Sequence, residues 1–577
     1  MNRFVDLYLA GGQVADLRAG ILRRADVAIV GDRIDAVIGD PSQPPPPSLP
    51  PERSNPPDSR RDRGTAIPTD PGRSVIDVTG RVLVPGYIEP HTHIVLANPV
   101  EFAFAVLPHG TTTVVADALP LQILTRSERL PGLLNDLGTL PVTLRWLIRL
   151  HPPAFSDEDR FTLDHLRPLW RHPATAAVGE VTRWTDVLDG SADLLLKIEA
   201  ARADGKRVEG HAPGASYARL VALAEAGITS CHEATTAAEV LDRLRAGLFV
   251  MLRHSSIRPD LPALAPAAAD ADAVPRIMLT ADGPTPAFIA EHGYMDYVID
   301  AAIRSGIPPL SAFRMATLNV AGYYGFEDVG EITPGARADL NVLREIIDPY
   351  PEMVVAGGRL AASDGQSVLA DRYSEPSAIP RGLWQDAFAP LHLPRLPRRV
   401  FEPPPGVPAC RLQNDVITAL EPRDTRSDDD LHAVLIDRRG RWLTRCLLRG
   451  FVRRLGGLAT TLNTAFDLLV VGQDPTDMAA AAAHVARMQG GLAIVEGGAE
   501  LLSLPFDLGP FSSRPWADVV DVNRRFNSLL GERGFPFNDP LFTLLFLTFD
   551  SLPWIRLTSR GVWDVRSRQV LAPAQPL

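Results

Sequence analysis

The feature of this sequence that most constrains its fold is a series of eight short hydrophobic runs, each ending in a polar or ionisable residue. Helical patterns lie between the runs, as in 191–203 and 215–226. Strands that alternate with helices build parallel sheets, and eight such units in about 245 residues match the usual size of a (β/α)8 barrel. We therefore predict an α/β fold with a TIM-type barrel over residues 85–330. The expected strands are 86–91, 111–117, 142–149, 176–181, 207–211, 228–233, 248–254 and 275–282.

Shorter strand patterns flank the barrel on both sides. We expect residues 1–84 and 331–372 to form one composite β-domain from both flanks. Within it, 41–73 is expected to be a disordered loop, because its proline-rich and charged composition cannot bury a core. A proline-rich linker is expected at 373–408, and a separate C-terminal α/β domain at 409–577.

Composition excludes several classes of protein. The chain has 577 residues, 45% of them hydrophobic and 22% charged, as is typical of soluble globular proteins. A net charge of −11 argues against nucleic acid as a partner, since phosphate binding needs clustered positive charge. The absence of a long apolar run argues against a membrane span, and three cysteines form no disulfide framework. We expect a cytoplasmic protein with a small-molecule substrate.

Four histidines are expected at the ends of barrel strands. His91 and His93 are two residues apart, so on a strand both side chains point to the same face. His211 and His232 end the fifth and sixth strands. Each of these two is, taken singly, more often structural, but four imidazoles at one rim favour a metal site. Imidazole and carboxylate ligands suit zinc, iron or manganese, in one or two ions.

Carboxylates at the strand ends complete the predicted site. Glu180 ends the fourth strand and is the candidate to bridge two metal ions, because neither lysine of the chain (Lys197 or Lys206) is expected at a strand end. Asp282 ends the eighth strand and is expected to bind metal and to transfer protons, although an aspartate here could also cap a turn. Glu233 is a second catalytic candidate.

The remaining candidates, Asp117 and Arg253, are expected to bind substrate. Together, these residues predict metal-activated hydrolysis at an sp2 carbon, either deamination of an amidine-like ring or opening of an amide.

Several segments of the sequence resemble the adenine deaminase family of the amidohydrolase superfamily, and the chain looks like a divergent member of that family. The resemblance implies the barrel, the composite β-domain and an adenine-deaminase-like C-terminal domain. It also implies conversion of adenine and water to hypoxanthine and ammonia with manganese, iron or zinc, and assembly as a homo-oligomer. The implied metal ligands are His91, His93, Glu180, His211 and His232. The matching segments are 85–93, 105–117, 210–214, 230–233, 315–319, 334–340, 489–495 and 555–565.

The sequence departs from the family pattern at three places. Residues 117–120 read Asp-Ala-Leu-Pro where the family has Asp-Pro-His-Glu, and Thr280-Ala281-Asp282 replaces Thr-Asp-Asp. Residues 463–467 have lost both histidines of the family's His-Asp-Ser-His-Asn segment. Two alternatives therefore stay open: hydrolysis of another cyclic amidine, amide or lactam, or a non-catalytic relative that binds a ligand. The deaminase class with a Cys-x-x-Cys zinc site is excluded, because the sequence has no such motif.

Overall fold

The structure is a computed structural model that describes residues 5–39, 74–152, 155, 158–269, 274–369, 384, 387–389, 391–393, 396–421, 427 and 429–577. The loop predicted at 41–73 and much of the predicted linker at 373–408 lie outside these residues.

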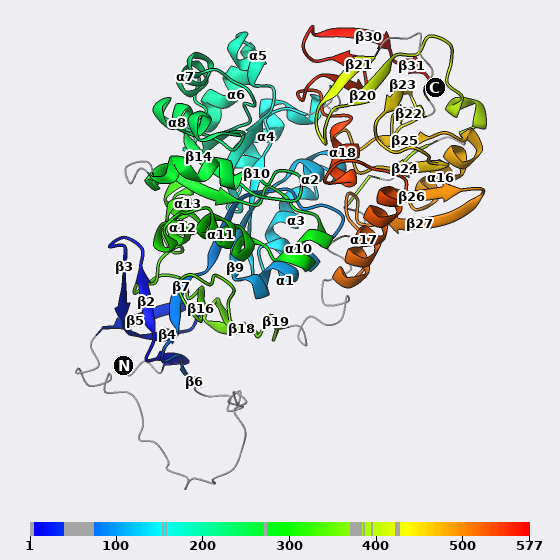
Figure 1. The fold of residues 1–577 in the computed structure, drawn as a ribbon. Helices are drawn as coiled ribbons and strands as arrows, with labels where there is room; N and C mark the ends of the chain where they lie inside the picture. Colours follow the sequence, from blue (N-terminus) through cyan, green and yellow to red (C-terminus); the bar gives the residue numbers. More distant parts are fainter. Residues whose placement is uncertain are drawn as a thin grey trace.

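A parallel barrel forms the centre of the molecule (Figure 1). In the described part of the chain, its eight strands follow one another in sequence order around the sheet, and the last lies beside the first. These strands are nearly all buried on both faces, which explains their continuous hydrophobic runs. The predicted barrel is thus confirmed. Its strands are β8 (Tyr87–Thr92), β9 (Thr111–Asp117), β10 (Thr143–Ile148), β11 (Thr175–Val181), β12 (Arg207–Gly210), β13 (Ser230–Cys231), β14 (Phe249–Arg253) and β15 (Ile277–Thr280).

Helices connect and cover the barrel strands (Figure 1). They are α1 (Pro99–Val106), α2 (Leu119–Leu124), α3 (Leu130–Leu137), α4 (Leu163–Trp170), α5 (Trp184–Leu188), α6 (Ala192–Ala203), α7 (Tyr217–Glu225), α8 (Ala237–Arg245), α9 (Leu261–Leu264), α10 (Pro286–His292), α11 (Met295–Arg304), α12 (Pro309–Met315) and α13 (Leu318–Tyr324).

Strands from both flanks of the barrel share one sheet. β16 pairs antiparallel with β7, so that Leu340 lies opposite Pro85 and Leu343 opposite Val82. The composite β-region expected from the sequence is therefore present. One sheet has the order β5-β4-β1-β6 and the other β19-β18-β17-β16-β7-β2-β3. The strands are β1 (Leu7–Ala10), β2 (Gln13–Asp16), β3 (Ile21–Arg24), β4 (Asp26–Val30), β5 (Arg33–Ile38), β6 (Ser74–Asp77), β7 (Val82–Pro85), β16 (Leu340–Leu343), β17 (Met353–Ala356), β18 (Arg359–Ser363) and β19 (Gln366–Ser367).

The C-terminal region is built on a large, mainly antiparallel sheet of order β21-β20-β23-β22-β25-β24-β26-β27, with β31 paired to β23. A smaller sheet, β28-β29-β30, packs nearby. The strands are β20 (Ala409–Leu412), β21 (Thr418–Glu421), β22 (Leu431–Ile436), β23 (Trp442–Arg449), β24 (Gly457–Thr460), β25 (Leu468–Gly472), β26 (Gly491–Glu496), β27 (Ala499–Pro505), β28 (Ile555–Thr558), β29 (Gly561–Asp564), β30 (Gln569–Pro573) and β31 (Gln575–Pro576). The helices are α16 (Pro475–Arg487), α17 (Trp516–Glu532) and α18 (Pro540–Phe546).

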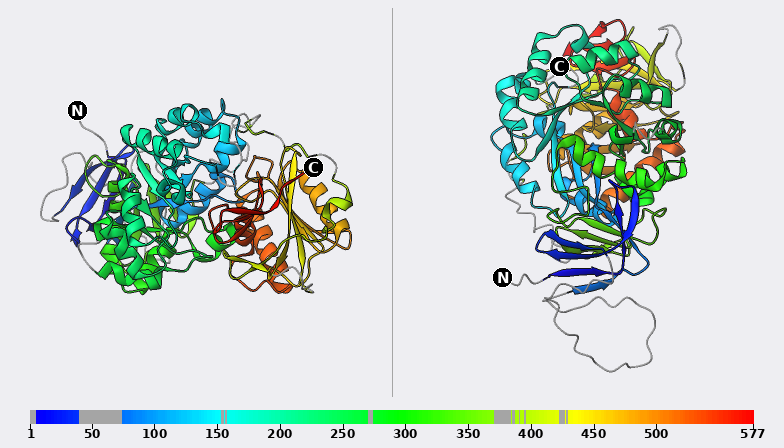
Figure 2. Two further views of the ribbon diagram at one scale, coloured as in Figure 1. Left: turned by 90° about the horizontal axis from the view of Figure 1, so that it is seen from above. Right: turned by 90° about the vertical axis from the view of Figure 1, so that its left-hand side faces the viewer.

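The two outer regions lie on opposite sides of the barrel. Figure 2 shows the N-terminal strands at one side and the C-terminal sheet with α16 and α17 at the other. The C-terminal region is joined to the barrel by partly buried polar contacts such as that of Arg183 with Asp550, 2.9 Å apart. The domain limits given above remain a proposal. In the described ranges, no helix combines the length and apolar character needed to cross a membrane.

Candidate metal centre

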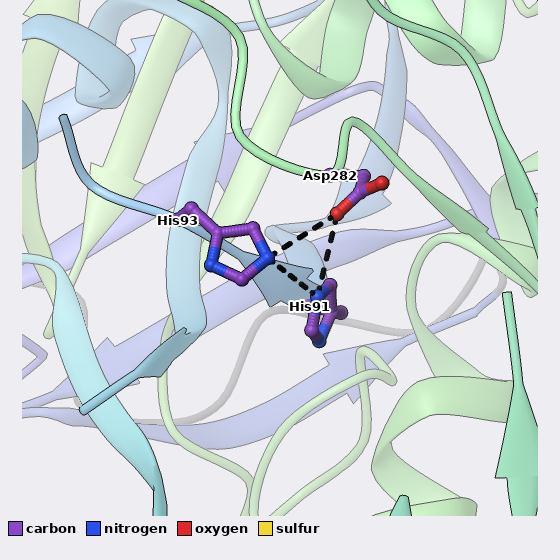
Figure 3. Close-up of side chains that lie close together, drawn as sticks. All are labelled: His91, His93 and Asp282. Atoms are coloured by element: carbon purple, nitrogen blue, oxygen red, sulfur yellow. Dashed lines mark hydrogen bonds and ion pairs between the residues drawn. The ribbon is translucent and has the colours of Figure 1, made fainter. Parts of the chain in front are cut away.

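The His-x-His pair lies where β8 leaves the barrel, and Asp282 meets it from the end of β15 (Figure 3). The two Nε2 atoms of His91 and His93 face each other at 3.2 Å. Asp282 Oδ1 is 3.3 Å from His91 Nε2 and 3.6 Å from His93 Nε2. Asp282 adopts a left-handed conformation (φ 51°), which aspartate tolerates better than most residues, and Gly283 beside it packs against the His93 backbone.

The other two histidines form a second group with Glu180. His211 Nδ1 and His232 Nε2 lie 3.3 Å apart, at the ends of β12 and β13. Glu180 Oε1 lies 3.2 Å from His232 Nε2 and also contacts His211 Nδ1. Its other oxygen, Oε2, is 3.9 Å from His93 Nε2. Glu180 therefore lies between the two histidine groups, where a bridging carboxylate would be needed.

Arg149, which sequence reasoning missed, holds two of these carboxylates. Its buried guanidinium donates to Asp117 Oδ2 at 2.6 Å and to Glu180 Oε2 at 2.5 Å. Burial opposes ionisation of the Glu180 carboxyl, but Arg149, His211 and His232 together outweigh it and lower the pKa of Glu180 well below its usual value. Asp117 Oδ2 also lies 3.2 Å from His93 Nδ1. In the sequence, Arg149 stands at the end of the third strand run, but an arginine at that place does not by itself indicate a role in a site.

The other acidic and basic candidates form a chain of ion pairs at the cavity wall. Arg253 Nη1 contacts Glu233 Oε1 and lies 2.9 Å from Asp282 Oδ2. Glu233 Oε1 is 3.6 Å from His232 Nε2 and 3.7 Å from His211 Nδ1. The nine residues expected from the sequence are thus gathered at one rim, although their individual roles stay predictions.

Two buried carboxylates behind the histidines were not expected from the sequence. Glu89 accepts hydrogen bonds from Thr280 Oγ1 at 2.6 Å and from the Ala281 amide at 2.9 Å, so it holds the first barrel strand to the last. Glu209 lies against His91 and His232. Each stands two residues before a histidine of the site, on the same strand face, and this spacing is the signal that could have found them.

The charges of the cluster suit a cation. Its carboxylates outnumber its guanidinium groups, and imidazole nitrogens of both groups face other nitrogens at 3.2–3.3 Å. Burial and the neighbouring His91 oppose protonation of His232, but Glu180 and Glu209 outweigh them and raise its pKa to about 10. A site that stabilises positive charge this strongly, with nitrogen and carboxylate donors, fits a borderline divalent ion.

A cavity of about 130 Å3 opens beside this cluster. The C-terminal region covers it with the segment 539–552, here called the roof, whose side chains at the cavity are apolar: Phe542, Leu545, Phe546, Phe549 and Leu552. Two polar side chains beside the roof, Asn463 and Thr464, also line the cavity, and both already have hydrogen-bond partners. Asn463 Nδ2 donates to the Asp467 carbonyl at 2.7 Å, and the Thr464 hydroxyl pairs with that of Thr548 at 2.8 Å.

Comparison with known proteins accords with this geometry. The amidohydrolase family model matches residues 82–361, and the adenine deaminase C-terminal domain model matches residues 411–569. An adenine deaminase of Cereibacter sphaeroides is 33% identical over 582 residues, covering 98% of this chain and 97% of that protein. The chain belongs to the adenine deaminase family.

Other relatives are also similar over most of the chain. A Halalkalibacterium halodurans protein named "Putative adenine deaminase" is 35% identical over 527 residues, or 88% of each chain. One of the same description in Bacillus subtilis is 33% identical over 520 residues, covering 86% of this chain and 87% of that protein. The protein is thus a hydrolase of the amidohydrolase type, a generally metal-dependent group, and this family membership confirms the resemblance read from the motifs.

Proposed function

We propose that this chain hydrolyses the exocyclic carbon–nitrogen bond of adenine, releasing hypoxanthine and ammonia. The observation that supports it is the gathering of four imidazoles around Glu180 and Asp282 beside a roofed cavity. The extensive similarity to adenine deaminases supports the substrate.

Two divalent ions fit the donor groups. His91 Nε2, His93 Nε2 and Asp282 Oδ1 would hold one, and His211 Nδ1 and His232 Nε2 the other, with Glu180 between them. Manganese, iron and zinc all suit such donors. When bound, these ions would lower the pKa of water toward neutrality.

Asp282 is the proposed proton carrier. In the reaction a C–O bond forms at C6 of the ring and the C6–N bond breaks. One proton of the attacking water moves to the departing amine, which leaves as ammonia, and the other ends on ring N1 of the 6-oxo product. Asp282 has one oxygen at the histidines and the other 2.9 Å from Arg253, so its carboxylate reaches from the proposed metal position into the cavity. Glu233, beside His211 and His232, is proposed to hold the ring through a hydrogen bond during this transfer.

The apolar character of the roof favours a second candidate function, the hydrolysis of another cyclic amidine, amide or lactam. A purine has polar ring nitrogens on several edges, and a buried polar atom without a partner costs about 1–3 kcal/mol. The roof side chains at the cavity are apolar, and Asn463 and Thr464 are already hydrogen-bonded. A less polar ring would leave fewer groups unsatisfied there.

The test is a panel of purines, pterins and cyclic amides assayed with protein loaded with manganese, iron or zinc. The His91→Ala variant should lose activity and bind less metal, because it removes a ligand of one proposed position. The Glu225→Gln variant, changed on the exposed end of α7, is the matched control. Turnover of His91→Ala equal to that of the wild type would contradict the proposed site. Turnover of a cyclic amide but not of adenine would favour the second candidate.

A further inference from the structure

Glu209 is a fully buried carboxylate that the proposed reaction does not use. Its side chain points from β12 into the barrel, beneath the histidines. Oε1 lies 2.7 Å from His91 Nδ1 and 3.3 Å from His232 Nδ1. The two imidazoles are stacked, with ring centroids 4.4 Å apart and an angle of 22° between their planes. A single carboxylate oxygen therefore faces one ring from each histidine group.

The contacts of Glu209 with these two rings are contacts between charged groups and lack hydrogen-bond geometry. Because the charge of Glu209 lies nearest to Nδ1 in both rings, it favours a proton there, and a cation that displaced the second proton would then take the lone pair on Nε2. His91 Nε2 faces His93 and Asp282, and His232 Nε2 faces Glu180 and His211. Glu209 thus turns the free nitrogen of one histidine toward each proposed metal position.

The surroundings of Glu209 fix its position. The Tyr324 hydroxyl, from α13, lies 3.3 Å from Glu209 Oε2 and 2.7 Å from the Pro90 carbonyl oxygen. On the neighbouring strand, Gly179 lets β11 approach closely, because a Cβ at this position would lie 2.4 Å from the Glu209 carbonyl oxygen. The carboxylate is therefore held between strands and a helix, and its position does not depend on a flexible loop.

We propose that Glu209 is a positioning residue that couples the two metal positions by orienting His91 and His232 together. This inference rests on the proposed function. Partners that orient a ligating histidine typically contribute 10–100-fold to metal affinity. Since Glu209 serves one ligand in each group, its loss should weaken both binding steps, whereas an ordinary partner of this kind would weaken one.

The experiment is a titration of metal-free full-length protein with Mn2+ and with Zn2+, resolving both binding steps by competition with a chelating indicator. Glu209→Gln keeps the side-chain volume and removes the charge. Both steps should weaken by about 10–100-fold relative to the wild type and to the Glu225→Gln control. Loss at one step alone, or unchanged affinity at both, would overturn the coupling.

Tyr324→Phe gives a second, milder test, needed if Glu209→Gln does not fold. It removes the hydroxyl beside Glu209 Oε2 and should weaken both steps in parallel, by a smaller factor; unchanged affinities would again refute the inference. A wild-type protein that binds no divalent cation would overturn the proposed function together with this inference. Normal metal binding by both variants would overturn this inference alone.

Discussion

Replacing Arg149 by methionine tests the charge balance of the site without replacing a proposed metal ligand. The Arg149 guanidinium donates to Asp117 Oδ2 at 2.6 Å, to Glu180 Oε2 at 2.5 Å and to the Glu180 carbonyl oxygen at 3.0 Å. The side chains of all three residues are at most 4% exposed. Methionine fills similar space and leaves both carboxylates without their cation.

The expected loss follows from this burial. Removing one partner of a buried ion pair costs about 3–5 kcal/mol, because the remaining charge is desolvated and unpaired. An exposed pair contributes about 0–1 kcal/mol. Arg171, whose side chain is 57% exposed and 2.6 Å from Asp204, therefore provides the control Arg171→Met. At about 2–4 °C per kcal/mol, Arg149→Met should lower the melting temperature by about 10 °C and the control by at most a few degrees.

Thermal unfolding followed by circular dichroism, in EDTA and in excess Mn2+, is the assay. The fall in melting temperature caused by Arg149→Met should be largest in EDTA and smaller with Mn2+, because a bound cation beside Glu180 would replace part of the lost charge. Arg149 also lowers the pKa of Asp117, although burial opposes this. The stability that it provides is therefore complete above pH about 4 and is lost in more acidic solution. A melting temperature for Arg149→Met equal to that of the control in EDTA would refute this account.

Two further predictions concern single carboxylates. Asp282→Asn should lower kcat by about 10²–10⁴-fold while retaining most of the bound metal, because the amide keeps an oxygen ligand but cannot accept the proton. Steady-state rates and metal analysis check this. A normal kcat would show that another group carries the proton. Asp539 caps α18, and burial raises its pKa to about 6. The contribution of Asp539 to wild-type stability should thus fall by about 3 kcal/mol as pH rises from about 4 to about 6. Asp539→Asn keeps the cap, so its unfolding free energy should lack this decline; parallel pH curves for the two proteins would contradict the assignment.

Hydrophobic periodicity was sufficient to locate the barrel. The eight predicted strands overlap β8 to β15, because strands buried on both faces need apolar residues at successive positions. The strand ends then identified His91, His93, His211 and His232, since a parallel barrel brings the C-terminal ends of its strands to one rim. Ligand chemistry and rim position are both encoded locally, in residue type and in distance from a hydrophobic run.

The partners of these residues were decided by the tertiary structure. Alternation along a strand tells which face a side chain occupies, but not which side chain of another strand it meets. The pairing of Arg149 with Asp117 and Glu180, and of Glu209 with two histidines, depends on strand register and on close approach at Gly179. The roof is a longer-range case. Residues 539–552 reach the cavity only because the C-terminal region packs against the barrel mouth, and such a contact between segments hundreds of residues apart leaves no periodic signal in the sequence.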